Sequence, residues 1–126
     1  MTEPPKLTNK DRSSWDLEKR TFQFSKKVRE FVKKLPRSIS NMEDIKQLVR
    51  SSGSIGANYI EANESLSKKD FVMRLKISRK EAKETRYWLE LLDCGQNEKL
   101  QTECTTLASE ATEYLKIFNA IITKSQ

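Results

Sequence analysis

The chain has 126 residues, which is enough for one domain with its own core and short for two. Lys and Arg total 24 against 18 Asp and Glu, so the formal net charge is +6, and 33% of the residues are charged. Gly and Pro number only three each. All-β folds need many turns, and turns use these two residues, so their scarcity favours long helices joined by few turns.

The absence of histidine excludes much chemistry: a Ser-His-Asp triad, a Cys-His dyad and every histidine-containing metal site. The two cysteines, Cys94 and Cys104, form no CxxC pair, which favours reduced thiols over a disulfide scaffold. No apolar run approaches the ~20 residues that span a bilayer, and residues 1–14 lack the apolar core of a signal peptide. We therefore expect a cytoplasmic, non-enzymatic protein that holds neither a metal nor a cofactor.

The N-terminal third of the chain predicts a tail and one helix. Residues 1–13 are polar, contain two prolines and are expected to form a flexible tail. A first helix is predicted from Ser14 to Leu35, where Pro36 ends it because the residue before a proline disfavours helical geometry. Its inner stripe repeats at three- and four-residue steps. The members of that stripe are Leu17, Phe24, Val28, Phe31, Val32 and Leu35.

A second helix is predicted to start near Ser40, because Ser40 and Glu43 fit a capping box. The centre of its inner stripe is small, with Ser52, Gly53 and Gly56 close together. A glycine in a helix interior costs ~1 kcal/mol relative to alanine, so we expect a neighbouring helix to approach closely there. A break at Gly53 is the alternative. The whole stripe comprises Ile45, Leu48, Val49, Ser52, Ile55, Gly56 and Tyr59.

Two further helices complete the predicted fold. Ser67 with Asp70 caps a third helix that runs to about Asp93, and Gly95 is a suitable stop. A fourth helix spans Asn97 to Thr123, with an almost unbroken heptad-like stripe. That stripe comprises Leu100, Cys104, Leu107, Ala111, Leu115, Phe118 and Ile122. Four long helices with short loops predict an all-α fold, an antiparallel up-down four-helix bundle over residues 14–126.

The positive charge lies mainly in the tail and on the first and third helices. Lys19, Lys26 and Lys33 repeat every seven residues opposite the apolar stripe, and Arg29 lies beside them. The third helix carries a second basic stripe, made of Lys69, Lys76, Arg79, Lys83 and Arg86. Such faces can neutralise phosphates along RNA or DNA. An acidic protein partner and a merely solvated helix face are the alternatives, and interleaved acids such as Glu18 and Glu81 weaken the nucleic-acid interpretation.

The third helix also has more apolar residues than one core face can use. Its inner stripe comprises Phe71, Leu75, Ser78, Ala82, Leu89 and Leu92. Four other apolar residues lie more than a quarter turn from that stripe: Met73, Ile77, Trp88 and Leu91. A helix that is apolar on two faces is buried on two sides, and in a single bundle the second face has only water or another subunit to meet. These four residues are therefore the candidate oligomer interface, and the alternative is that they are scattered surface apolar residues of the kind that most proteins carry. Trp15 and Phe22 likewise lie off the inner stripe of the first helix.

Two other patterns resemble a phosphate-binding loop and a di-metal site, but each lacks a feature that such a site requires. Residues 50–56 are rich in small side chains but lack the spacing of a phosphate-binding loop, and no strand precedes them. Glu61, Glu64, Glu81 and Glu84 could imitate the carboxylates of a di-metal bundle. Such sites pair glutamate with Glu-x-x-His, and this chain has no histidine.

Four segments in order carry a resemblance to a known family. They are Ser54-Ile55-Gly56-Ala57-Asn58-Tyr59-Ile60-Glu61-Ala62, Ser67-Lys68-Lys69-Asp70-Phe71, Lys80-Glu81-Ala82-Lys83-Glu84-Thr85 and Tyr87-Trp88-Leu89-Glu90-Leu91-Leu92. Together, over residues 14–124, they resemble the four-helix-bundle proteins encoded in intervening sequences of bacterial 23S ribosomal RNA genes. That family includes the accessory variability determinant of diversity-generating retroelements. Many members have proline where this chain has Gly56, and glycine where it has Ala62.

The resemblance implies a four-helix bundle that assembles as a ring-shaped homopentamer with a basic surface. For the retroelement member it implies binding to nucleic acid and to a reverse transcriptase. We therefore expect a non-enzymatic oligomer that binds RNA or DNA with low sequence specificity, as an accessory factor of a reverse transcriptase or a ribosomal RNA element. The alternative is a protein-interaction scaffold without nucleic-acid binding, docking on a reverse transcriptase or another enzyme.

Overall fold

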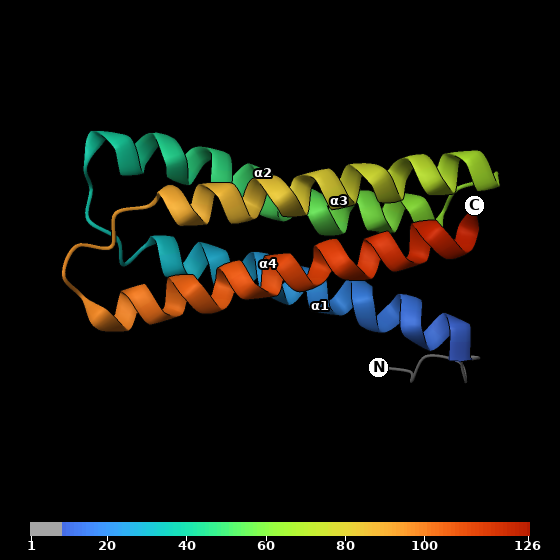
Figure 1. Ribbon diagram of the computed structural model, residues 1–126, viewed down its shortest axis with the longest axis horizontal. Coiled ribbons are helices and arrows are strands. Elements are labelled where there is room, and N and C mark those ends of the chain that lie inside the picture. Colours follow the sequence, from blue (N-terminus) through green and yellow to red (C-terminus); the bar gives the residue numbers. More distant parts are fainter. Residues whose placement is uncertain (1–8) are drawn as a thin grey trace, which may run out of the picture.

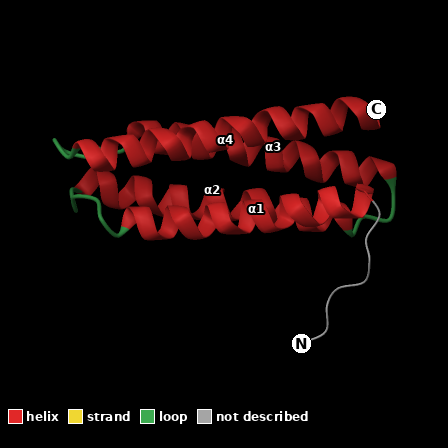
Figure 2. Cartoon of the chain, turned by 90° about the horizontal axis from the view of Figure 1, so that it is seen from below, coloured by secondary structure: helices red, strands yellow, loops and turns green. Residues whose placement is uncertain are grey.

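The computed structural model describes residues 9–126, with side chains described from Trp15 onward. Its four helices are α1 (Asn9–Val32), α2 (Ile39–Asn63), α3 (Lys68–Leu91) and α4 (Glu98–Ser125). They run alternately up and down along one long axis (Figure 1). Seen from the side, α1 and α2 form one layer and α3 and α4 form the other (Figure 2). The all-α antiparallel bundle predicted from the sequence is confirmed.

The four helices do not pack equally. The α2–α3 and α3–α4 pairs have the most extensive contacts, α1 packs mainly on α2, and the α1–α4 pair has the fewest. No backbone approach joins α1 to α3 within residues 9–126, so these two helices lie diagonally opposite each other. Any surface on the outer side of α1 therefore lies across the bundle from one on the outer side of α3.

The helix ends follow the sequence signals in part. Ser67 caps α3 by accepting a hydrogen bond from the Asp70 N–H at 3.1 Å, as predicted. Asn97, which lies at the predicted start of the fourth helix, caps α4 by accepting from the Leu100 N–H. α1 begins at Asn9, earlier than the predicted Ser14, so the first eight residues of the predicted tail lie outside the described residues. α3 ends at Leu91, before the predicted Asp93, and Gly95 takes its positive φ of 65° in the following turn.

The predicted cap of α2 is wrong by two residues. Ser38, not Ser40, is the N-cap, and its Oγ accepts from the Asn41 N–H at 3.2 Å. This register places the Asn41 side chain inside the bundle, where its Nδ2 donates to the carbonyls of Pro36 at 2.9 Å and Asp93 at 2.8 Å. Its Oδ1 accepts from the Asp93 N–H at 3.0 Å. One buried amide thus joins the α1–α2 loop to the α3–α4 loop.

The centre of α2 is the closest approach to α1. α2 is unbroken through Gly53, Gly56 and Ala62, so the alternative of a break is wrong. A Cβ built on Gly56 would lie 2.8 Å from Thr21 Oγ1, which leaves room there for hydrogen only. Ser25 Oγ donates to the Ser52 carbonyl at 2.9 Å across the same contact. The small residues are therefore explained by close helix packing, as the sequence predicts.

A single core fills the space between the four helices. Most members of the predicted stripes supply it, with Val32, Ile45, Cys104 and Leu115 only partly buried at its margins. Val49 of the predicted stripe is not part of it, whereas Tyr114, which no predicted stripe contained, is fully buried in it. Aromatic rings occupy the middle: Phe24 meets Tyr114 edge-on with 5.3 Å between ring centroids, and Tyr59 lies 5.7 Å from Phe118. Within the described part of the chain, no helix has an apolar stretch of membrane-spanning length.

Candidate nucleic-acid interface

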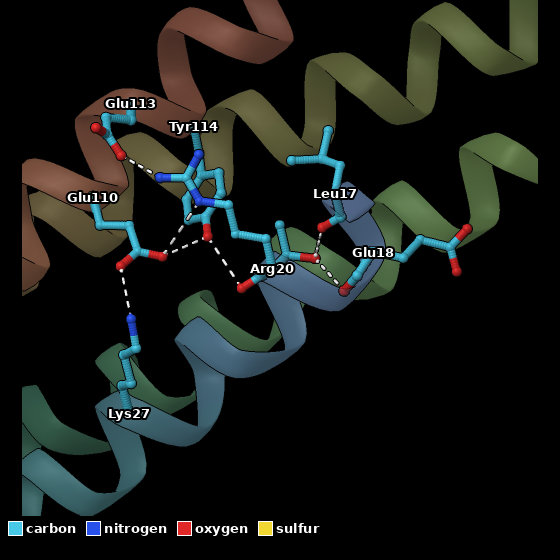
Figure 3. A network of polar contacts seen from close by, with 8 residues as sticks. Leu17, Glu18, Arg20, Lys27, Glu110, Glu113 and Tyr114 are labelled. Atoms are coloured by element: carbon cyan, nitrogen blue, oxygen red, sulfur yellow. Dashed lines mark hydrogen bonds and ion pairs between the residues drawn. The ribbon is translucent and has the colours of Figure 1, made fainter. Parts of the chain in front are cut away.

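The basic residues of α1 fall into two stripes with different surroundings. Arg20, Lys27 and Lys34 repeat every seven residues and face α4. There they meet acidic side chains: Lys27 Nζ lies 3.4 Å from Glu110 Oε1 and Lys34 Nζ lies 2.7 Å from Glu103 Oε1. Arg20 pairs with Glu113 and lies 3.9 Å from Glu110 (Figure 3). This stripe is largely neutralised by surface ion pairs with α4, which bridge the sparsely packed α1–α4 seam.

Tyr114 of α4 belongs to the same network of polar contacts. Its hydroxyl lies 2.6 Å from Glu110 Oε2 and 3.1 Å from the Arg20 carbonyl oxygen, and the Arg20 guanidinium carbon lies 4.9 Å from the centroid of the ring (Figure 3). Burial, with the adjacent Glu110 carboxylate, raises the pKa of the Tyr114 phenol above its ordinary value. The hydroxyl therefore stays protonated and acts as a structural donor.

The second stripe of α1 is the predicted one. It lies opposite the core face of α1, and only the end of its Arg29 side chain reaches another helix, at Gly53 of α2. Lys19, Lys26, Arg29 and Lys33 are all exposed. Lys33 lies 3.2 Å from Glu30 on its own helix, and Arg29 donates to the Ser25 carbonyl at 3.2 Å. Lys19 and Lys26 form no ion pair with any residue that the structure describes. Positive charge on this outward stripe thus remains available to an external anion.

The predicted basic stripe of α3 lies along its flank toward α4. Lys76 and Lys83 are exposed, while Arg79 donates to Asn119 Oδ1 of α4 at 2.6 Å. Arg86 Nε lies 3.9 Å from Glu90 Oε1, and both line a groove between α3 and α4. Because α1 and α3 are diagonal, the eight candidate residues form two separate basic surfaces, each with its own orientation.

The predicted oligomer interface divides into exposed and packed residues. Met73 and Leu91 are 54% and 49% exposed, and Tyr87, which the sequence analysis did not select, is 57% exposed beside them. Trp88 packs against the core margin, and its buried Nε1 has no hydrogen-bond partner in the described chain. Met73 and Ile77 line a groove of about 490 Å³ at the α2–α3 turn. The other residues lining this groove are Glu61, Glu64, Ser65, Leu66, Asp70 and Arg74.

The two thiols lie together at the α3–α4 turn. Cys94 and Cys104 line one groove of about 620 Å³, and Cys104 Sγ donates to the Leu89 carbonyl at 3.2 Å. Burial raises the pKa of Cys104 to about 12, and it raises the pKa of Cys94 as well. A thiol is nucleophilic as its thiolate, so neither cysteine is activated for covalent catalysis at neutral pH.

Comparisons with known proteins agree with this architecture. A family model described as 23S rRNA-intervening sequence protein matches residues 14–120. No curated protein matches the chain significantly. A crystal structure from Bacteroides thetaiotaomicron is described as a protein with unknown function from the S23 ribosomal protein family. It is similar with a TM-score of 0.71 and 33% sequence identity, covering 83% of this chain and 96% of that chain.

Proposed function

Because the chain belongs to the 23S rRNA-intervening sequence protein family, we propose that it is a non-enzymatic, oligomeric bundle that binds RNA or DNA with little sequence specificity. One observation carries the proposal. The acids of α4 neutralise Arg20, Lys27 and Lys34, yet Lys19 and Lys26 on the opposite side of α1 face solvent with no acidic partner in the described chain. Regularly spaced lysines of this kind contact phosphates, which provides affinity without reading sequence.

Charge reversal on α1 tests the binding function. Changing Lys19, Lys26 and Lys33 to glutamate is expected to weaken binding to mixed-sequence RNA and DNA and to lower the slope of log K against log salt by about 3, one for each lost phosphate contact. Fluorescence anisotropy between about 50 and about 200 mM salt measures both quantities. The same triple change at Lys76, Arg79 and Lys83 tests the α3 surface independently.

A matched control separates this stripe from net charge. Lys68, Lys99 and Lys124 are exposed and lie outside both stripes, so their change to glutamate alters the net charge equally. We expect this control to retain most of the affinity. Equal losses in the control and in the α1 variant would contradict a localised site. If the wild-type protein binds neither RNA nor DNA at low salt, the scaffold that docks on a reverse transcriptase or another enzyme is the better account.

We further propose that copies of the chain associate through the outward face of α3. Exposed Met73 and Leu91, with partly buried Ile77 and Trp88, form two apolar pairs on the outer side of a helix whose core face is already complete, and Lys80 and Glu84 lie between the pairs. We call these four apolar residues the strip, because exposed apolar side chains outside a complete core are candidates for an interface. The expected assembly is the homopentamer implied by the resemblance described above, in which repeated basic surfaces would act together on one polymer.

The assembly proposal has its own measurement. Light scattering in line with size exclusion is expected to give a mass near that of a homopentamer, and Met73→Glu with Leu91→Glu is expected to reduce it to that of a monomer. Ile39→Glu is the control, because Ile39 is 89% exposed at the start of α2 and lies outside the strip. A monomeric wild-type protein, or a double variant that keeps the wild-type mass, would contradict this interface.

A further inference from the structure

The outward stripe of α1 contains aromatic rings as well as cations. Trp15, Lys19, Phe22, Lys26, Arg29 and Lys33 follow one another at steps of four and three residues, which places all six on one face of the helix. All six are exposed, with Trp15 at 53% and Phe22 at 59%. Lys26 Nζ lies 5.8 Å from the centroid of the Phe22 ring. We call these six residues the aromatic-basic stripe.

The two rings have no role in the bundle itself. The core face of α1 is complete without them, because Leu17, Phe24, Val28 and Phe31 supply its buried apolar side chains. Trp15 and Phe22 lie seven residues apart, or about 10.5 Å along the helix. Within a duplex the phosphates of one strand follow each other at about 3.4 Å along the axis, so this distance spans about three nucleotides of a stacked strand and fewer of an extended one. The stripe therefore offers two flat apolar surfaces at nucleotide-scale spacing, between lysines that reach phosphates.

We propose that the aromatic-basic stripe of α1 is a binding site for single-stranded nucleic acid, in which bases stack on Trp15 and Phe22 while Lys19, Lys26 and Lys33 contact the phosphates. The inference rests on the proposed function and names its preferred ligand. Bases of a single strand expose their π-faces to aromatic side chains, whereas bases of a duplex are stacked on each other. A purely electrostatic surface would bind both forms through phosphates alone.

The charge of the stripe favours this ligand over a second copy of the chain. Its six residues include four cations and no acid. The α2–α3 groove offers acids and apolar side chains that could receive such a stripe from another molecule, but Arg74 lies in that groove as well. The outward face of α3 differs, because its exposed ring, Tyr87, packs edge-on against Trp88 at 5.1 Å between centroids. Tyr87 thus supplies a control of similar exposure.

The experiment compares two ligands and two aromatic variants. Fluorescence anisotropy would measure binding of an oligothymidine of about 20 nucleotides and of a mixed-sequence duplex of equal length at the same salt. For the double variant Trp15→Ala with Phe22→Ala, we expect affinity for oligothymidine to fall about tenfold or more, since stacking on an aromatic ring contributes strongly for each base. Duplex affinity should change less than twofold, and Tyr87→Ala should change neither. Trp15→Tyr with Phe22→Tyr should restore single-strand binding.

A second readout observes the ring directly. In a Trp88→Phe background, Trp15 is the sole tryptophan, and we expect oligothymidine to quench its fluorescence while the duplex does not. If the aromatic double variant loses affinity for oligothymidine and for the duplex equally, or loses affinity for neither, the inference is overturned. The proposal that the lysines bind phosphates would then still stand. A lower scattering mass of the free variant would assign the stripe to contacts between copies and also overturn it. Absence of wild-type binding to both ligands would instead refute the proposed function itself.

Discussion

Replacing Asn41 with alanine is expected to lower the free energy of unfolding by about 3 kcal/mol, a large share of the stability of a domain this size. The substitution removes three hydrogen bonds that join two loops. It leaves the carbonyls of Pro36 and Asp93 and the Asp93 N–H without that partner. Each buried polar group left unpaired costs about 1–3 kcal/mol, and partial access of water to the exposed loop residues keeps the total below the sum.

Urea unfolding at a fixed protein concentration measures this effect, because the stability of an oligomer depends on concentration. Asn58→Ala is the matched control on the same helix. Its Nδ2 donates to the Ser54 carbonyl within α2 at 2.9 Å and its Oδ1 accepts from Arg74 near solvent, so we expect a loss below about 1 kcal/mol. Equal losses for the two asparagines would show that Asn41 does not hold the loops together.

Replacing Gly56 with valine is expected to destabilise the bundle by about 2–3 kcal/mol, although valine is the better helix former. The first added carbon already lies 2.8 Å from Thr21 Oγ1 and 3.2 Å from Thr21 Cβ, and the methyl groups would extend further into α1. The two helices must separate or distort, and the contact between Ser25 and Ser52 is then lost as well.

Gly53 lies one turn before Gly56 in α2 and serves as the control position for the same substitution. A Cβ there meets only the end of the Arg29 side chain at 3.5 Å, so Gly53→Val is expected to change stability by less than about 0.5 kcal/mol. Adding Thr21→Ala to Gly56→Val should recover part of the loss, and the double-mutant cycle gives the size of the recovery. Similar losses at the two glycines would refute close packing as the reason for Gly56.

Local signals in the sequence were sufficient for most of the fold. The cap at Ser67 is confirmed, because Asp70 follows it at the spacing that a capping box requires. Before α2, Ser38 and Ser40 both satisfy the capping rule, and the choice depends on the tertiary position of Asn41. The early start of α1 has no apolar stripe to mark it, because its first turns are polar. The ambiguous ends were therefore those that distant contacts decide.

At the candidate site, too, contacts between helices could not be predicted from the sequence. Two lysine-arginine series of period seven run along α1, and the apolar stripe places one of them opposite the core and the other at the core edge. Nothing within α1 tells which helix the series at the core edge meets. The acids of α4 decide it, since Glu103 and Glu110 are also seven residues apart and select Lys34 and Lys27. The outward series is readable from the sequence because it lies opposite the apolar stripe, whereas the paired series needs acidic partners that lie on another helix. Trp15 and Phe22 lie on the same helical face as the outward lysines, and this combination was not predicted.

The amide of Asn41 gives the bundle two unequal ends. At one end it ties both loops into a single hydrogen-bonded unit, while the other end carries the α2–α3 turn and the first turns of α1. α1 is also the helix with the fewest contacts to its neighbours. Local opening in proteins begins where packing is sparse, so we expect α1 to open more readily than the other three helices. The helix that carries the aromatic-basic stripe is thus the one best able to adjust to a flexible strand.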